Sequence, residues 1–124
     1  MQAEAYPTGE LKHGPAALLS KNVPLIALAT HDPHSPDSLH RYEKTVNLLR
    51  DMKAQGAEIV AIATEGDTVI ADIVRHTIFV PRCIEHLAPI FEVIPLQMFA
   101  YFTAINRGID VDSPRNLVKA VTRE

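Results

Sequence analysis

The sequence predicts an α/β fold with a parallel sheet, and three observations support this class. Two short apolar runs, 23–29 and 58–64, have the length and content of strands buried on both faces. An amphipathic helical pattern lies between them, and strand, helix and strand in this order make one βαβ unit. A third apolar run follows at 77–81. With 124 residues, the chain has the size of one ordinary domain.

The composition excludes several classes of protein. Twelve Lys and Arg against fifteen Asp and Glu give a net charge of −3, which provides no basic field for nucleic acid or an anionic membrane. Cys83 is the only cysteine, so an intrachain disulfide framework and a multi-cysteine zinc site are excluded. No basic-then-apolar segment opens the chain. We therefore expect a folded cytoplasmic protein with neither nucleic-acid nor membrane partners.

The first strand and the first helix are separated by turn chemistry. Residues 32–38 (DPHSPDS) are rich in Pro, Asp and Ser, which favour turns. Apolar side chains then recur at spacings of three and four residues through Lys53, as expected for a surface helix: Leu39, Tyr42, Val46, Leu49 and Met52. Ser38 or Asp37 can cap the start of this helix, and Gly56 can end it.

The second strand, 58–64, follows this helix directly. Residues 68–74 form a short element whose type the pattern leaves open. The third strand, 77–81, includes Pro81, which has no N–H group to donate. This strand should therefore end at the proline or lie near the edge of the sheet.

Residues 87–105 make the most apolar segment of the chain and read as a helix that is apolar on every side, which is typical of a helix buried on all sides. Pro89 suits a first turn, and Pro95 should kink the helix. Glu92 and the two prolines argue against a membrane span. Three strands and one surface helix are too few to cover such a helix. The chain should therefore expose a large apolar patch and associate, with a homodimer as the expected state.

Two groups of side chains could carry metal or nucleophile chemistry. His31 and His34 are three residues apart, but a proline separates them and no third ligand stands nearby, so a solvated loop is the better interpretation. Cys83 has His86 three residues on, yet nothing indicates an activated thiolate, and a small buried apolar role is favoured. We expect no metal.

Phosphate-binding and cofactor signatures are missing from the sequence. It has no GxxxxGK[ST], GxGxxG or GxSxG motif. Serines occur only at positions 20, 35, 38 and 113, so no Ser/Thr-dense loop can open a helix and hold a phosphate. We therefore expect no cofactor.

Two terminal segments carry a specific family resemblance. Residues 3–15 read AEAYPTGELKHGP, and residues 110–124 read DVDSPRNLVKAVTRE. Both are similar to signatures of the glucosamine-6-phosphate synthase family, the isomerizing glutamine–fructose-6-phosphate aminotransferases. Between them, APIF at 88–91 and IPLQ at 94–97 are similar to the same family's C-terminal helix. The resemblance spans essentially the whole chain in the same order.

The resemblance implies a three-layer parallel-sheet SIS (sugar isomerase, Rossmann-like) lobe that is incomplete at its N-terminal side. Residues 1–108 correspond to the C-terminal portion of the second SIS lobe, and residues 109–124 to the C-terminal tail. Members of the family transfer the amide nitrogen of glutamine to fructose 6-phosphate and isomerise the product to glucosamine 6-phosphate. A sugar phosphate is therefore the implied small-molecule partner.

The same resemblance assigns roles to three residues. His13 corresponds to the histidine that helps open the sugar ring, and Lys119 to the tail lysine that can form an imine with the ketose carbonyl. Val118 lies beside it at a substrate-binding position where the family more often has alanine. The family's isomerising glutamate, Ser/Thr phosphate loop and glutaminase cysteine have no counterpart in this sequence. We therefore expect the isolated chain to be inactive. The alternative is a stand-alone SIS-derived module that binds a phosphosugar or a regulatory partner.

Overall fold

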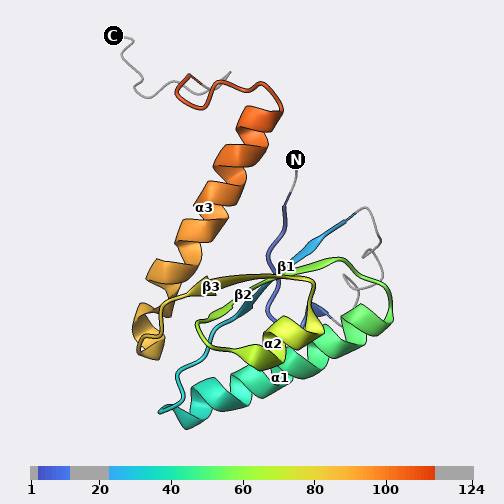
Figure 1. Cartoon of the computed structure of the whole chain (residues 1–124), viewed down its shortest axis with the longest axis vertical. Coiled ribbons are helices and arrows are strands. Elements are labelled where there is room, and N and C mark those ends of the chain that lie inside the picture. The colour runs from blue at the N-terminus through green and yellow to red at the C-terminus, as the bar shows by residue number, and fades with distance from the viewer. Residues whose placement is uncertain (1–2, 12–22, 114–124) are drawn as a thin grey trace. The chain divides into compact units, whose positions relative to one another are not determined.

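The computed structural model describes residues 3–11 and 23–113, which form an α/β arrangement (Figure 1). The elements follow one another as β1 (Leu25–Ala29), α1 (Pro36–Ala54), β2 (Ile59–Thr64), α2 (Thr68–Ile73), β3 (His76–Val80), the 3-10 turn η3 (Glu85–Leu87) and α3 (Ala88–Asn106). The chain divides into two compact units, Met1–Glu92 and Val93–Glu124, which are described in turn.

The sheet of the first unit has the strand order β1-β2-β3, and both pairings are parallel. Central strand β2 is buried at every position except Val60, which is half-buried. The strand predicted within residues 23–29 is confirmed, but its predicted burial on both faces is wrong, because Ala29 is the only buried residue of β1 and Leu28 is 46% exposed. The physical reason is position: within the described residues, β1 has a neighbouring strand on one side only.

Helix α1 begins earlier than the sequence pattern predicts. The Ser35 hydroxyl accepts the Ser38 N–H at 3.3 Å, and Pro36 supplies a fixed φ at the first helical position. Ser35 is therefore the N-cap, in place of Ser38 or Asp37. The predicted end of the helix at Gly56 is confirmed. Gly56 has φ +84° and its N–H donates to the Lys53 carbonyl, while the Ala57 N–H donates to the Met52 carbonyl.

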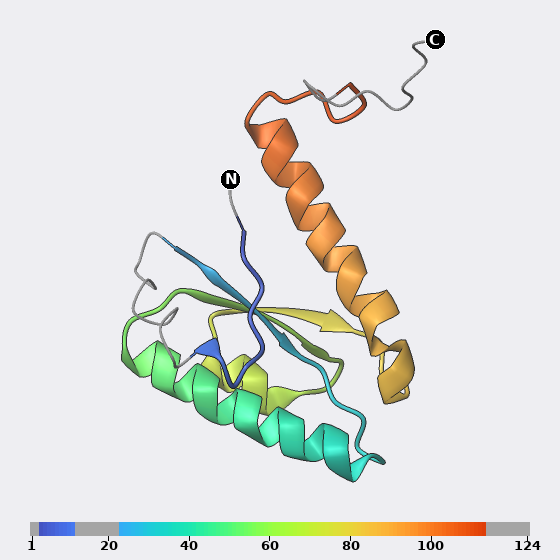
Figure 2. The same cartoon turned by 180° about the vertical axis from the view of Figure 1, so that it is seen from behind.

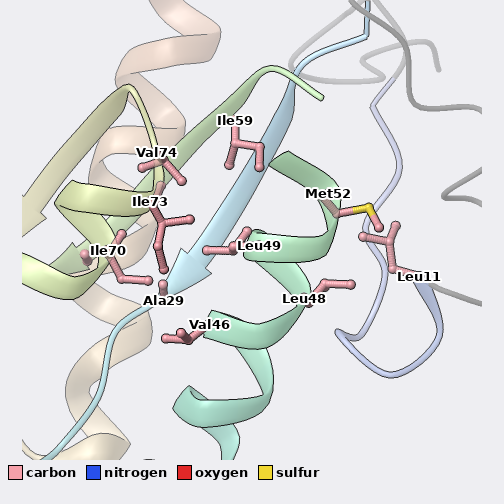
Figure 3. Packing of buried hydrophobic residues seen from close by; sticks show 12 residues of the cluster. Leu11, Ala29, Val46, Leu48, Leu49, Met52, Ile59, Ile70, Ile73 and Val74 are labelled. Atoms are coloured by element: carbon pink, nitrogen blue, oxygen red, sulfur yellow. The ribbon is translucent and has the colours of Figure 1, made fainter. Parts of the chain in front are cut away.

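The inward face of α1 contributes four of the twelve residues of the hydrophobic core cluster. Val46, Leu49 and Met52 are buried, as predicted. Leu39 is 37% exposed, contrary to the prediction, because buried Ser38 takes the inward position in the first turn and binds the Asp32 N–H. In Figure 3, Met52 points toward Leu11 of the N-terminal segment. The cluster also contains Ala29, Leu48, Ile59, Ala61, Ala63, Ile70, Ile73 and Val74.

The segment 68–74, whose type the sequence left open, forms the short helix α2. Asp67 caps it by accepting the Ile70 N–H at 3.0 Å. Strand β3 ends at Val80, directly before Pro81, and lies at an edge of the described sheet, as its proline predicts. Figure 2 shows α1 and α2 on the same face of the sheet.

Helix α3 continues unbroken through Pro95, with Pro89 in its first turn. Gly108, with φ +68°, ends it by donating to the Ile105 carbonyl. No residue of α3 is buried, so the predicted apolar exposure is confirmed for the described residues. The segment Glu85–Asn106 is long and apolar enough to cross a membrane by length and composition, a test that core helices also pass.

Candidate functional site

The three residues that the sequence assigns to chemistry, His13, Val118 and Lys119, lie outside the described residues. Their geometry therefore contributes nothing to the site described below. The chemistry-bearing side chains that the structure does describe gather elsewhere, at one edge of the sheet.

This edge is formed by the carboxyl ends of the three parallel strands, which stop at Ala29, Thr64 and Val80. The loops that follow them, 30–35, 65–67 and 81–84, meet there because parallel strands all end on the same side. Open parallel sheets bind ligands at their carboxyl edge. Buried polar groups at this edge are therefore the candidates for a functional site.

One polar network at this edge is centred on Asp67, whose side chain is 2% exposed. Its Oδ1 accepts the Ile70 N–H, and its Oδ2 accepts the Tyr42 hydroxyl at 2.8 Å. Burial, and then the hydrogen bond to Asp67, raise the pKa of Tyr42 well above its ordinary value of 10.0. The phenol is therefore held as a neutral donor to a buried carboxylate.

His31 adds an imidazole to this network. Its ring lies 4.3 Å from the ring of Tyr42 between centroids, and its Nδ1 is 3.8 Å from Asp67 Oδ2, too far for a hydrogen bond. Nδ1 is buried and has no hydrogen-bond partner. The main chain of His31 is fixed by Thr64, whose Oγ1 accepts the His31 N–H at 3.0 Å. The imidazole of His31 therefore faces the buried side chain of Asp67 without a hydrogen bond to it.

A second network links the start of α1 to the segment before α3. Arg41 pairs with Glu85, and the Ser35 hydroxyl donates to Glu85 at 3.1 Å. The hydrogen bond from Arg41 lowers the pKa of the Glu85 carboxyl, with a smaller contribution from Ser35. Glu92 accepts a hydrogen bond from Thr30. The Arg41 guanidinium is therefore paired with a carboxylate at this edge.

The cleft between these networks is small. Its volume is about 10 Å³, which is room for one water molecule, and its lining includes Thr30, His31, Ser38, Arg41 and Cys83. A more open hollow of about 290 Å³ lies over α1 and α2, with Glu43, Arg50 and Val69 among its lining residues. Pockets for drug-sized ligands are typically about 300–1,000 Å³. The described cleft therefore cannot enclose a sugar phosphate.

The structure separates the two histidines of the metal hypothesis. His31 faces Asp67, whereas His34 is exposed, and its N–H donates to the Asp32 carboxylate. In residues 3–11 and 23–113, no three His, Cys, Asp or Glu side chains gather to hold a metal ion. The ring of His31 is thus partly packed against Tyr42. The composition of its loop, which is rich in turn-forming residues, does not predict this contact.

Cys83 is half-buried, so the prediction of a small buried side chain is only partly right. Burial, and then the charges of Glu92 and Asp32, raise the pKa of its thiol, in agreement with the prediction that the thiolate is not activated. Sequence reasoning missed the link between Tyr42 and Asp67. The available signal was Asp67 itself, an N-cap residue between a strand and a helix.

Comparison with known proteins places this geometry in context. The model of the SIS domain family matches residues 1–107. The glutamine–fructose-6-phosphate aminotransferase [isomerizing] of Thermus thermophilus is 47% identical over 124 residues, which are 100% of this chain and 19% of that protein. The protein of the same name from Caldanaerobacter subterraneus subsp. tengcongensis is 41% identical, with the same two coverages.

A solved structure shows the same arrangement. The C-terminal domain of glucosamine-fructose-6-phosphate aminotransferase from Francisella tularensis aligns with a TM-score of 0.76 and 34% identity. The alignment covers 91% of this chain and 30% of that one. The chain thus spans about a fifth of the length of the curated relatives it matches.

Proposed function

The chain belongs to the SIS domain family, and we propose that it forms the C-terminal part of the isomerase domain of a glutamine–fructose-6-phosphate aminotransferase. It is homologous to the isomerase part of these proteins over its whole length. The observation that carries the proposal is 47% identity over all 124 residues to a protein of that name. In this proposal, residues 1–108 are the end of the second SIS lobe and residues 109–124 are the tail.

Two side chains would carry the chemistry. His13 is suited to move the proton in sugar ring opening, because an imidazole titrates near neutral pH. The Lys119 amine is suited to add to the C2 carbonyl of open-chain fructose 6-phosphate, forming an imine with loss of water. Val118 would line the substrate beside that lysine. The partner is a sugar phosphate, and no cofactor is required.

We propose that the isolated chain does not turn over this substrate. The described cleft of about 10 Å³ supports this. The sequence also has no Ser/Thr-dense loop to hold a phosphate. The chain would act in the cytoplasm, a location that fits a sequence with a single cysteine, and as a homodimer.

Calorimetric titration of the chain with fructose 6-phosphate and glucosamine 6-phosphate tests the proposal, with unphosphorylated fructose as the control. We expect no turnover with glutamine or ammonia, and weak or undetectable heat for either sugar phosphate. Tight binding that is lost in Lys119→Met would support the alternative, a stand-alone phosphosugar-binding or regulatory module. Turnover by the 124-residue chain alone would overturn the proposed inactivity.

Trapping of the imine tests the role of Lys119 separately. This chain would replace the matched 19% of the Thermus thermophilus relative, and the chimera would be treated with fructose 6-phosphate and borohydride. Mass spectrometry should then find the reduced sugar adduct on Lys119 and none in Lys119→Arg. An adduct that persists in Lys119→Arg would refute the assignment of this residue.

A further inference from the structure

One apolar side chain ties the N-terminal segment to the core of the first unit. Leu11 is 6% exposed and belongs to the buried cluster that also contains Leu48 and Met52 of α1. The described residues before it are all exposed except Thr8, which is half-buried. In Figure 3, Met52 points toward Leu11. Within residues 3–11, Leu11 is thus the side chain that attaches this segment to α1.

A turn leads the chain into this contact. The Glu10 N–H donates to the Pro7 carbonyl at 2.9 Å, which closes a β-turn immediately before Leu11. Helix α1 is the rigid side of the contact, because it has 19 residues and six of them are buried. A side chain that is close-packed against such a helix has little freedom to shift. The main chain at Leu11 is therefore held both by packing and by the turn.

The position of Leu11 matters because His13 follows two residues later, a chain length of at most about 7 Å. Opening of a fructofuranose ring breaks the bond between C2 and O5 and moves the proton of the C2 hydroxyl to O5. An imidazole that moves this proton must come within about 2.6–3.2 Å of the atoms that exchange it. A misplacement of about 1 Å can slow such a step by about 100-fold.

We propose that Leu11, packed against Met52, is a positioning residue for sugar ring opening and acts through His13. This inference rests on the proposed function, and it adds two residues to which the family resemblance assigns no role. Both side chains are apolar, so they can act on the reaction only through where they hold the chain. Ring opening, rather than imine formation at Lys119, is therefore the step that depends on this contact.

An open-chain substrate separates positioning from structural damage. 5-Deoxyfructose 6-phosphate has no hydroxyl at C5 and carries a phosphate on O6, so it stays an open-chain ketone and needs no ring opening. In the chimera with the Thermus thermophilus relative, Leu11→Ala should lower kcat with fructose 6-phosphate by about 10- to 100-fold. It should change KM by less than about twofold and leave kcat with the 5-deoxy sugar unchanged.

Met52→Ala should reproduce this pattern from the other side of the contact. Because the two residues act at one contact, the double variant should lose no more kcat than the weaker of the two single variants. Leu11→Met and Met52→Leu keep the side-chain volume and should restore kcat to within about threefold of the parent chimera. Leu11→Val, a milder truncation, gives the same measurement if Leu11→Ala does not fold.

Ile73→Ala is the matched control. Ile73 is 7% exposed and belongs to the same cluster, but it lies on α2. Its change to alanine removes the same number of carbon atoms as Leu11→Ala. It should lower the Tm of the chimera by a similar amount and leave kcat unchanged with both sugars.

His13→Asn in the same chimera distinguishes this inference from the assignment on which it rests. If His13→Asn lowers kcat with fructose 6-phosphate and Leu11→Ala does not, His13 keeps its role and positioning by Leu11 is overturned. If His13→Asn leaves kcat unchanged, the role of His13 is itself refuted, and the inference with it. An equal loss of kcat with both sugars in Leu11→Ala would indicate general damage and would also overturn the inference.

Discussion

Asp67→Ala is the substitution that most directly tests the buried network at the carboxyl edge of the sheet. It removes the cap of α2, which typically costs about 0.5–2 kcal/mol. It also removes the acceptor of the Tyr42 hydroxyl, a loss of about 1 kcal/mol for a partly buried hydrogen bond. We therefore expect the free energy of unfolding to fall by about 1.5–3 kcal/mol. Asp67→Asn keeps an oxygen that can cap α2, so its free energy of unfolding should fall by less.

Urea unfolding monitored by circular dichroism measures these differences, and the slope against urea should stay the same in each variant. A double-mutant cycle with Tyr42→Phe should return a coupling of about 1 kcal/mol, because Asp67 and Tyr42 bond directly. Asp72→Ala, an exposed aspartate on α2, is the control and should change stability by less than about 0.5 kcal/mol. The reasoning is refuted if Asp67→Ala matches this control, or if its effect adds to that of Tyr42→Phe without coupling.

Three further predictions concern pH and backbone conformation. The pKa of Tyr42 is raised in the folded chain, so the unfolded chain loses this proton first and the free energy of unfolding should fall above pH 10. The decline is at most about 1.4 kcal/mol per pH unit, and smaller here because Tyr42 is only partly buried. Tyr42→Phe should flatten this decline in urea melts at alkaline pH. Because the pKa of Glu85 is lowered in the folded chain, its carboxylate contributes stability above its ordinary pKa of 4.5, and this stability is lost as the pH falls. Carbon NMR titration of the Arg41→Met variant should show the pKa of Glu85 moving up. An unchanged pKa of Glu85 would contradict its pairing with Arg41. Gly56→Ala should lower stability by about 1–2 kcal/mol in urea melts because of its φ of +84°, whereas Gly9→Ala, whose added Cβ meets nothing within 4 Å, should be close to neutral.

The order and type of the main elements could be predicted from the sequence, because period and turn chemistry act locally. Two apolar runs predicted β1 and β2, one amphipathic pattern predicted α1, and Gly56 predicted the end of that helix. The start of α1 was missed because Ser35 and Ser38 both resemble N-caps, and only the three-dimensional arrangement shows that Ser38 binds the Asp32 N–H instead.

The candidate site was harder to predict, because its contacts join residues far apart in the sequence. Tyr42 was correctly placed on the inward side of α1, but no periodicity shows that its hydroxyl reaches Asp67, 25 residues away. His31 lies in a loop whose composition indicates solvent, yet its ring packs on Tyr42. The residues that the family resemblance assigns, His13, Val118 and Lys119, lie outside the described part of the chain.

The contrast between β1 and β2 shows what local pattern does and does not encode. Both runs are short and apolar, and both were predicted to be buried on two faces. Strand β2 has a partner on each side and is buried almost throughout, whereas β1 has one partner among the described residues and is buried only at Ala29. Apolar content thus reports the burial for which a segment is suited, and its neighbours decide the burial it receives. The same difference is larger in α3, which is apolar on every side and has no buried residue.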